Sequence, residues 1–185
     1  YGLIALIQIT VTVLGVLVLG IIFKVPIEAL IICFSVSILR KYSGGAHAGS
    51  IESCTVIAII YSTVFAIISR FLLAPVISSF MLMMIAIAVF LVSFLIVYKK
   101  APVDSPRKPI RSEQKRKRMR QGSFLILIIY LALSLIFCFL GNESVVFRSY
   151  CISLFFGVLW QIMTLTKLGF FILGITDIFS EAKTT

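Results

Sequence analysis

Long apolar runs dominate this chain and restrict it to folds that dissolve in lipid. Leu3–Phe23 and Val76–Tyr98 each have about the 20 residues that a helix needs to cross a bilayer core. The chain has 61% hydrophobic and 13% charged residues. A water-soluble domain of 185 residues with this composition would expose much of its apolar surface to water. Because lipid offers the backbone no hydrogen bonds, such runs must be helical. The sequence predicts an all-α, polytopic transmembrane helical bundle forming a single domain over residues 1–185.

Five apolar runs are long enough to cross a membrane, and the length of a sixth does not decide whether it crosses. The five are Leu3–Phe23, Cys54–Leu73, Val76–Tyr98, Ser123–Leu140 and Val145–Leu165. Ile27–Leu39 is short, so it is a tilted span, a re-entrant helix or an interfacial helix. Leu168–Phe179 is also short, and we expect it at the interface or against the bundle. The prediction is five to six spans.

Positive charge is concentrated beside the membrane spans. Ten of the 17 Lys and Arg residues fall between Lys99 and Arg120. Two crossings separate this segment from Arg40 and Lys41, so both basic segments face one compartment, which the positive-inside rule identifies as the cytoplasm. A basic cluster beside a span also attracts anionic lipid, so membrane lipids are expected partners and nucleic acid is not.

The polar interval from Arg40 to Cys54 carries the residues that can do chemistry. It contains the single histidine of the chain, His47, and a cysteine seven positions later. Gly44, Gly45 and Gly49 give its backbone access to conformations that other residues rarely adopt, so we expect the chain to bend there. If the protein is an enzyme, its reacting groups lie in this interval.

His47 and Cys54 form a candidate nucleophile and base. A free cysteine is mostly protonated at neutral pH, and His47 is the one candidate base. On an unbroken helix the two would be separated by about 10.5 Å in rise, so the chain must turn back between them. A helix capped by Ser50, with Glu52 in its first turn, would place the thiol near a helix N-terminus, where backbone N–H groups and an imidazolium stabilise a thiolate. This pair implies acyl transfer, with Glu52 or a backbone carbonyl orienting the imidazole.

Simpler interpretations of the same residues stay open. A cysteine in an apolar run is usually inert packing, and we expect this of Cys33, Cys138 and Cys151. Arg40 by itself fits a topology anchor. Seven scattered acids form no metal cluster, so we expect no metal and no cofactor. A non-catalytic peptide exporter or a membrane scaffold is the alternative function.

The motif resembles a known family of membrane proteins. Arg40, Gly44-Gly45, His47-Ala48 and Cys54 are similar in pattern to accessory gene regulator protein B (AgrB), a family of bacterial membrane cysteine endopeptidases. Two further blocks resemble later parts of that family: Ala101-Pro102 with Lys108-Pro109-Ile110, and Gln161 with Leu165-Thr166 and Leu168-Gly169. The resemblance extends over nearly the whole chain.

The resemblance implies a function and a location. It identifies His47 and Cys54 as a catalytic dyad, with Arg40, Gly44, Gly45 and Glu52 as surrounding or substrate-binding residues. It implies cleavage of the C-terminal part of an AgrD-like amphipathic pro-peptide through a thioester, which lets the peptide cyclise to a thiolactone or lactone quorum-sensing signal. It also implies a homodimer in the bacterial cell membrane.

Overall fold

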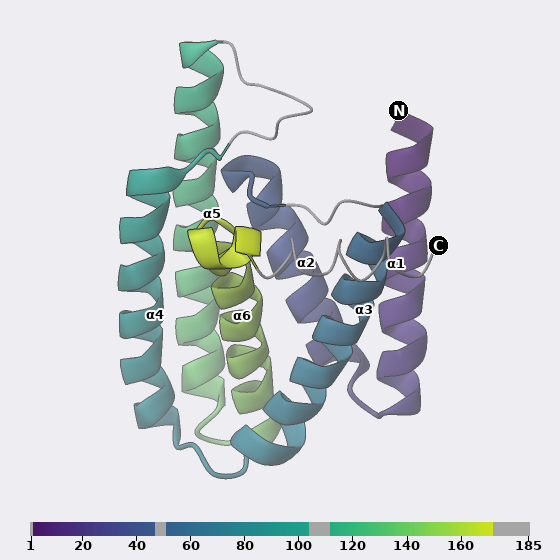
Figure 1. Cartoon of the computed structure of the whole chain (residues 1–185). Coiled ribbons are helices and arrows are strands. Elements are labelled where there is room, and N and C mark those ends of the chain that lie inside the picture. Colours follow the sequence, from purple (N-terminus) through teal and green to yellow (C-terminus); the bar gives the residue numbers. More distant parts are fainter. Residues whose placement is uncertain (1, 47–50, 104–111, 172–185) are drawn as a thin grey trace.

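The fold is a bundle of antiparallel helices (Figure 1). The computed structural model describes residues 2–46, 51–103 and 112–171. The helices are α1 (Gly2–Ile22), α2 (Pro26–Ser43), α3 (Ile51–Ile67) continued by the π-helical η1 (Ile68–Leu73), α4 (Ser79–Lys100), α5 (Glu113–Leu140) and α6 (Val145–Thr164). Within these described ranges the one β interaction is an isolated bridge between Gly44 and Val103. The all-α prediction is confirmed.

Four helical segments of the described chain are long and apolar enough to cross a membrane. They are Glu52–Leu73, Ser79–Lys100, Glu113–Leu140 and Val145–Thr164. α1 adds a shorter apolar stretch, Leu6–Ile22. These are the lengths and compositions of a polytopic membrane protein.

The short run Ile27–Leu39 belongs to α2, a continuous helix of 18 residues that continues through Arg40 to Ser43. At 1.5 Å per residue α2 is about 27 Å long, and it packs beside the other helices of the bundle (Figure 1). α2 is not among the four helical segments named above, so its path relative to the membrane stays a prediction.

Local sequence explains where the helices begin and end. Pro26 starts α2, since its fixed φ suits the first helical position. Gly44 ends α2 with a positive φ of 68°, a conformation that glycine adopts at little cost. Ser78 and Ser144 cap α4 and α6 by accepting hydrogen bonds from the N–H groups of Met81 and Val146, both at 3.3 Å.

α6 forms the centre of the bundle. More than half of its spanning window is buried, against 28% or less for the other three spans. Gly157 of α6 packs so tightly on the Ser35 side chain and the Ile32 carbonyl of α2 that a Cβ would overlap them. The Tyr130 hydroxyl of α5 donates to the Ser35 carbonyl at 3.1 Å. Small residues at such contacts let membrane helices approach closely.

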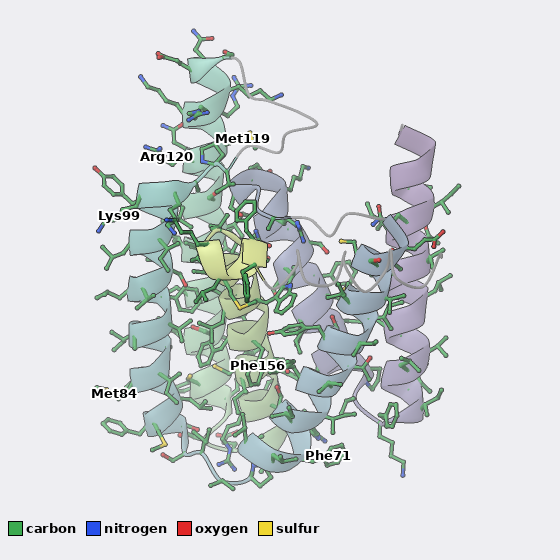
Figure 2. The ribbon with its side chains drawn as sticks, viewed as in Figure 1. Phe71, Met84, Lys99, Met119, Arg120 and Phe156 are labelled. Carbon is green, nitrogen blue, oxygen red and sulfur yellow. The ribbon has the colours of Figure 1, made fainter. Side chains whose placement is uncertain are left out.

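One end of the bundle brings distant parts of the sequence together. In Figure 1 the end of α2, the end of α4 and the start of α5 all lie at the same end of the bundle. Figure 2 shows Lys99 and Arg120 at this end and Phe71 near the opposite end. We call the end with Arg40, Lys99 and Arg120 the basic end. The prediction that both basic segments share one side of the bundle is confirmed by this arrangement.

Candidate functional site

A short loop of two glycines and one alanine follows α2 at the basic end. Gly44 and Gly45 have φ angles of 68° and 131°, which side-chain-bearing residues rarely adopt. A Cβ on Gly44 would overlap the Val103 carbonyl, and one on Gly45 would lie 2.6 Å from Thr164 Oγ1. Both positions therefore require glycine. We call Gly44–Ala46 the glycine loop.

Hydrogen bonds fix the glycine loop to two other parts of the chain. The Val103 N–H donates to the Ser43 carbonyl at 3.0 Å, beside the bridge between Gly44 and Val103. On the α6 side, the Ala46 N–H donates to the Thr164 carbonyl at 3.0 Å. Because backbone hydrogen bonds hold the glycine loop on both sides, it has little freedom to move.

The Gln161 side chain adds two polar contacts at this loop. Gln161 is fully buried in α6. Its Nε2 donates to the Gly44 carbonyl at 2.7 Å and to Ser43 Oγ at 3.0 Å. Because an unpaired carbonyl inside the bundle would be costly, this amide stabilises the loop where a leucine could not.

Arg40 holds the far end of the glycine loop. It lies in the last turn of α2, and its Nη2 donates to the Ala46 carbonyl. Arg40 also lines a cavity that Cys54 lines. Arg40 therefore contacts the residue before His47 and lies in the wall of the same cavity as the predicted nucleophile.

Cys54 opens on a narrow cavity between three helices. It lies in the first turn of α3, as predicted, and is partly exposed. The cavity measures about 50 Å³ and lies between α2, α3 and α6. Its walls include Cys33, Ser37 and Arg40 from α2, Cys54, Ala58 and Tyr61 from α3, and Trp160 from α6. We call it the Cys54 slot.

The structure places the remaining predicted residues as follows. His47 and Ser50 lie outside the described residues. Glu52 is in the first turn of α3, exposed to solvent, and it does not line the Cys54 slot. Arg40 thus contacts the glycine loop and shares a cavity with Cys54, while the predicted role of Glu52 toward His47 stays a prediction.

The other cysteines are buried, as expected of packing residues. Cys138 and Cys151 contact each other across α5 and α6, with 3.4 Å between their sulfur atoms. Cys33 is also buried, but it lines the Cys54 slot. Its position in a wall of the site was not predicted.

Comparison with known proteins identifies the family. The family model of accessory gene regulator B (AgrB) matches residues 1–165 of this chain. The chain belongs to the AgrB family. It is 42% identical over 184 residues to AgrB-like protein 2 of Clostridium perfringens strain 13, covering 98% of this chain and 86% of that protein. It is 40% identical, with the same coverage, to an AgrB-like protein of C. perfringens strain SM101. No solved structure is significantly similar to the chain.

The fold explains why the separate sequence blocks that resemble AgrB occur together. Ala101-Pro102 directly precedes Val103, which pairs with Gly44, and the Ala101 carbonyl accepts a hydrogen bond from Arg120 Nε at 2.9 Å. Gln161 contacts the same loop from α6. Ala101-Pro102 and Gln161, remote in sequence, therefore both lie beside the glycine loop, whereas Lys108-Pro109-Ile110 lies outside the described residues. The resemblance had already named Gln161, and an amide inside an apolar run is a second signal, since such residues in membrane helices usually have a partner.

Proposed function

We propose that this AgrB-family protein is a membrane cysteine endopeptidase in which Cys54 is the nucleophile and His47 is the general base and acid. The observation that carries the proposal is the position of Cys54. It lies in the first turn of α3, at the mouth of the Cys54 slot and close to Arg40. The thiol is thus partly accessible, near a cation and in the first turn of a helix, which is the environment of a reactive cysteine.

The anchoring of Ala46 supports the role of His47. Arg40 and Thr164 hold the carbonyl and the N–H of Ala46. Consecutive Cα atoms are about 3.8 Å apart, so the imidazole is attached to a fixed point beside the arginine that faces Cys54. A base must come within hydrogen-bond reach of its nucleophile, and this attachment favours that approach.

The proposed reaction has two steps. His47 takes the thiol proton, and the Cys54 sulfur attacks the scissile carbonyl carbon. The tetrahedral intermediate collapses when His47 returns the proton to the leaving amine, which breaks the C–N bond and leaves an acyl thioester on Cys54. An internal thiol or hydroxyl of the bound peptide, or water, then attacks the thioester and releases Cys54.

The proposed substrate is an amphipathic pro-peptide of the AgrD type, cut near its C-terminus. Such a peptide concentrates at the membrane interface, where the mouth of the Cys54 slot lies if the basic end faces the cytoplasm. The first turns of α5, with Lys115, Arg116, Lys117 and Arg118, extend from the basic end and suit an acidic peptide tail as well as lipid headgroups. Ring closure to a quorum-sensing signal and assembly as a homodimer belong to the same proposal.

Two substitutions test the proposed function. Cys54→Ala and His47→Ala should each abolish cleavage of a co-expressed AgrD-like peptide, since one removes the nucleophile and the other the base. The readout is the cleaved fragment by mass spectrometry, with the membrane content of each variant measured by immunoblot. Cys138→Ala is the matched control, because it removes a buried cysteine far from the slot in sequence.

The outcome also separates the peptidase from the alternative. An exporter or scaffold has no use for the Cys54 thiol, so it predicts cleavage and signal levels unaffected by Cys54→Ala. Wild-type cleavage in either the Cys54 or the His47 variant refutes the proposed dyad.

A further inference from the structure

We propose that the Cys54 slot is the specificity pocket of this protein, binding the apolar side chain of the substrate residue on the acyl side of the cleaved bond. The inference rests on the proposed function, because it assumes that Cys54 attacks a peptide carbonyl. It adds the part of the substrate that the enzyme recognises and the residues that recognise it.

The slot runs along two antiparallel helices, α2 and α3, with Trp160 of α6 in its wall. On α2 its residues Cys33, Val36, Ser37 and Arg40 follow the spacing i, i+3, i+4, i+7, and on α3 the same spacing relates Cys54, Ile57, Ala58 and Tyr61. Such residues share one helix face. α2 and α3 are antiparallel, so Arg40 and Cys54 lie at the same, basic end of the groove (Figure 1). Seven residues of α3 correspond to a depth of about 10 Å below Cys54.

The deep part of the groove is mostly hydrocarbon. The Ser37 hydroxyl donates to the Cys33 carbonyl at 2.8 Å, and the Tyr61 hydroxyl donates to the Phe156 carbonyl at 3.0 Å. The Tyr61 and Trp160 rings pack together with 4.1 Å between their centroids. Ser62 adds one more hydroxyl to the lining, but below Arg40 the lining has no charged side chain. This part of the slot therefore suits an apolar side chain and disfavours a charged one.

The polar chemistry of the groove is at its mouth. Cys54 and Arg40 face each other there. The Arg40 Nε is buried and, among the described residues, has no hydrogen-bond partner. A peptide carbonyl at the mouth would therefore meet a nucleophile and a cationic donor, and the attached side chain would point down the groove. Peptidases commonly select substrates by such a pocket beside the nucleophile.

Peptidyl chloromethyl ketones test the pocket without knowledge of the natural substrate. These reagents place a chosen side chain next to the carbon that the thiolate attacks; a C–S bond forms and chloride leaves. Membranes containing the full chain are treated with reagents carrying Ala, Leu, Phe or Asp at that position, and labelling of Cys54 is timed by mass spectrometry. We expect the Leu or Phe reagent to react at least about tenfold faster than the Asp reagent, the discrimination that an apolar pocket provides.

Substitutions within the slot should change this preference. Ala58→Leu fills the groove one turn below Cys54, so the advantage of Leu and Phe over Ala should fall about tenfold or more. Ile57→Ala widens the groove and should favour Phe over Leu. Ile60→Ala, a matched change on the exposed face of α3 where Ile60 is 55% exposed, should leave the order as in the wild type. Iodoacetamide labelling of Cys54 in each variant checks that the thiol remains accessible.

The failures of the two proposals are distinguishable. If the ketones label Cys54 but Ala58→Leu keeps the wild-type order of side chains, the pocket is refuted and the proposed function stands. If iodoacetamide labels Cys54 while none of the ketones does, the pocket and the peptidase are both refuted. A lipid chain that fills the slot would also leave the order of side chains unchanged in Ala58→Leu. In that case, removing lipid with detergent should raise the labelling rate of Cys54 equally for all four ketones.

Discussion

Single residues determine the shape of the site through hydrogen bonds to backbone. Arg40 holds the Ala46 carbonyl, and Gln161 holds the Gly44 carbonyl. The two side chains come from different helices and fix opposite ends of the same three-residue loop. The loop therefore depends on polar contacts inside a bundle that is otherwise held by apolar packing, where each lost contact leaves a costly unpaired group.

Gln161→Leu should sharply reduce cleavage without removing the protein from the membrane. Leucine has a similar size but cannot donate to the Gly44 carbonyl or to Ser43 Oγ, and an unpaired buried group costs about 1–3 kcal/mol. If that cost falls on the glycine loop, the cleavage rate should drop about tenfold or more. The rate of peptide cleavage per amount of membrane protein measures the effect.

The control for this substitution is Gln8→Leu. Gln8 is a partly buried glutamine of α1, away from the glycine loop and the slot. It should retain wild-type cleavage. Full activity in the Gln161→Leu variant would show that the loop keeps its conformation without the amide, contrary to the positioning role.

At the level of helices, the sequence predicted most elements but not their partners. Apolar length predicted the spans, and the glycines predicted the bend after α2, because these signals are local. The sequence left the path of residues 27–39 undecided, since α2 includes Arg40 and Lys41 and its apolar part alone is too short to cross. The contacts of Gly44 with Val103 and Gln161 join residues far apart in sequence, so they follow only from how the helices pack.

The opposite end of the bundle contains an ion pair that joins three helical elements. Glu28 of α2 is buried and lies 3.3 Å from Arg70 of η1. Ser149 of α6 donates to the same carboxylate oxygen at 2.8 Å. These contacts join the first turn of α2 to η1, which continues α3, at the end of both elements opposite the basic end.

Arg70→Met should destabilise the bundle, because it leaves the buried Glu28 carboxylate without its cation. Removing one partner of a buried pair costs about 3–5 kcal/mol, and the partial exposure of Arg70 lowers the expected loss to about 1–3 kcal/mol. Thermal unfolding in detergent, followed by tryptophan fluorescence from Trp160, measures the change. Adding Glu28→Gln should recover part of the lost stability; equal stability of Arg70→Met and wild type would contradict the role of the ion pair.

At the scale of the whole molecule, charge is distributed unequally between the two ends. Among the described residues, the basic end carries Arg40, Lys41, Lys99, Lys100 and the cationic first turns of α5. The other end carries fewer cations: the exposed Lys24, Arg70, which is paired with Glu28, and Arg148, which donates to the Ile77 carbonyl at 3.0 Å. Because Lys and Arg flanking spans are retained in the cytoplasm, this asymmetry favours one orientation in the membrane.

A pair of introduced cysteines should reveal this orientation in intact cells. In a Cys54→Ala background the remaining cysteines are buried, so an impermeant maleimide should report only the new thiol. Both sites are exposed: Lys117 lies in the first turns of α5, and Asn142 lies just beyond the opposite, C-terminal end of the same helix. Asn142→Cys should be labelled from outside, and Lys117→Cys only after the membrane is permeabilised. The reverse pattern would place Cys54 and the mouth of its slot outside the cell. A pro-peptide made in the cytoplasm would then have to cross the membrane before cleavage, so the result decides whether processing precedes or follows export.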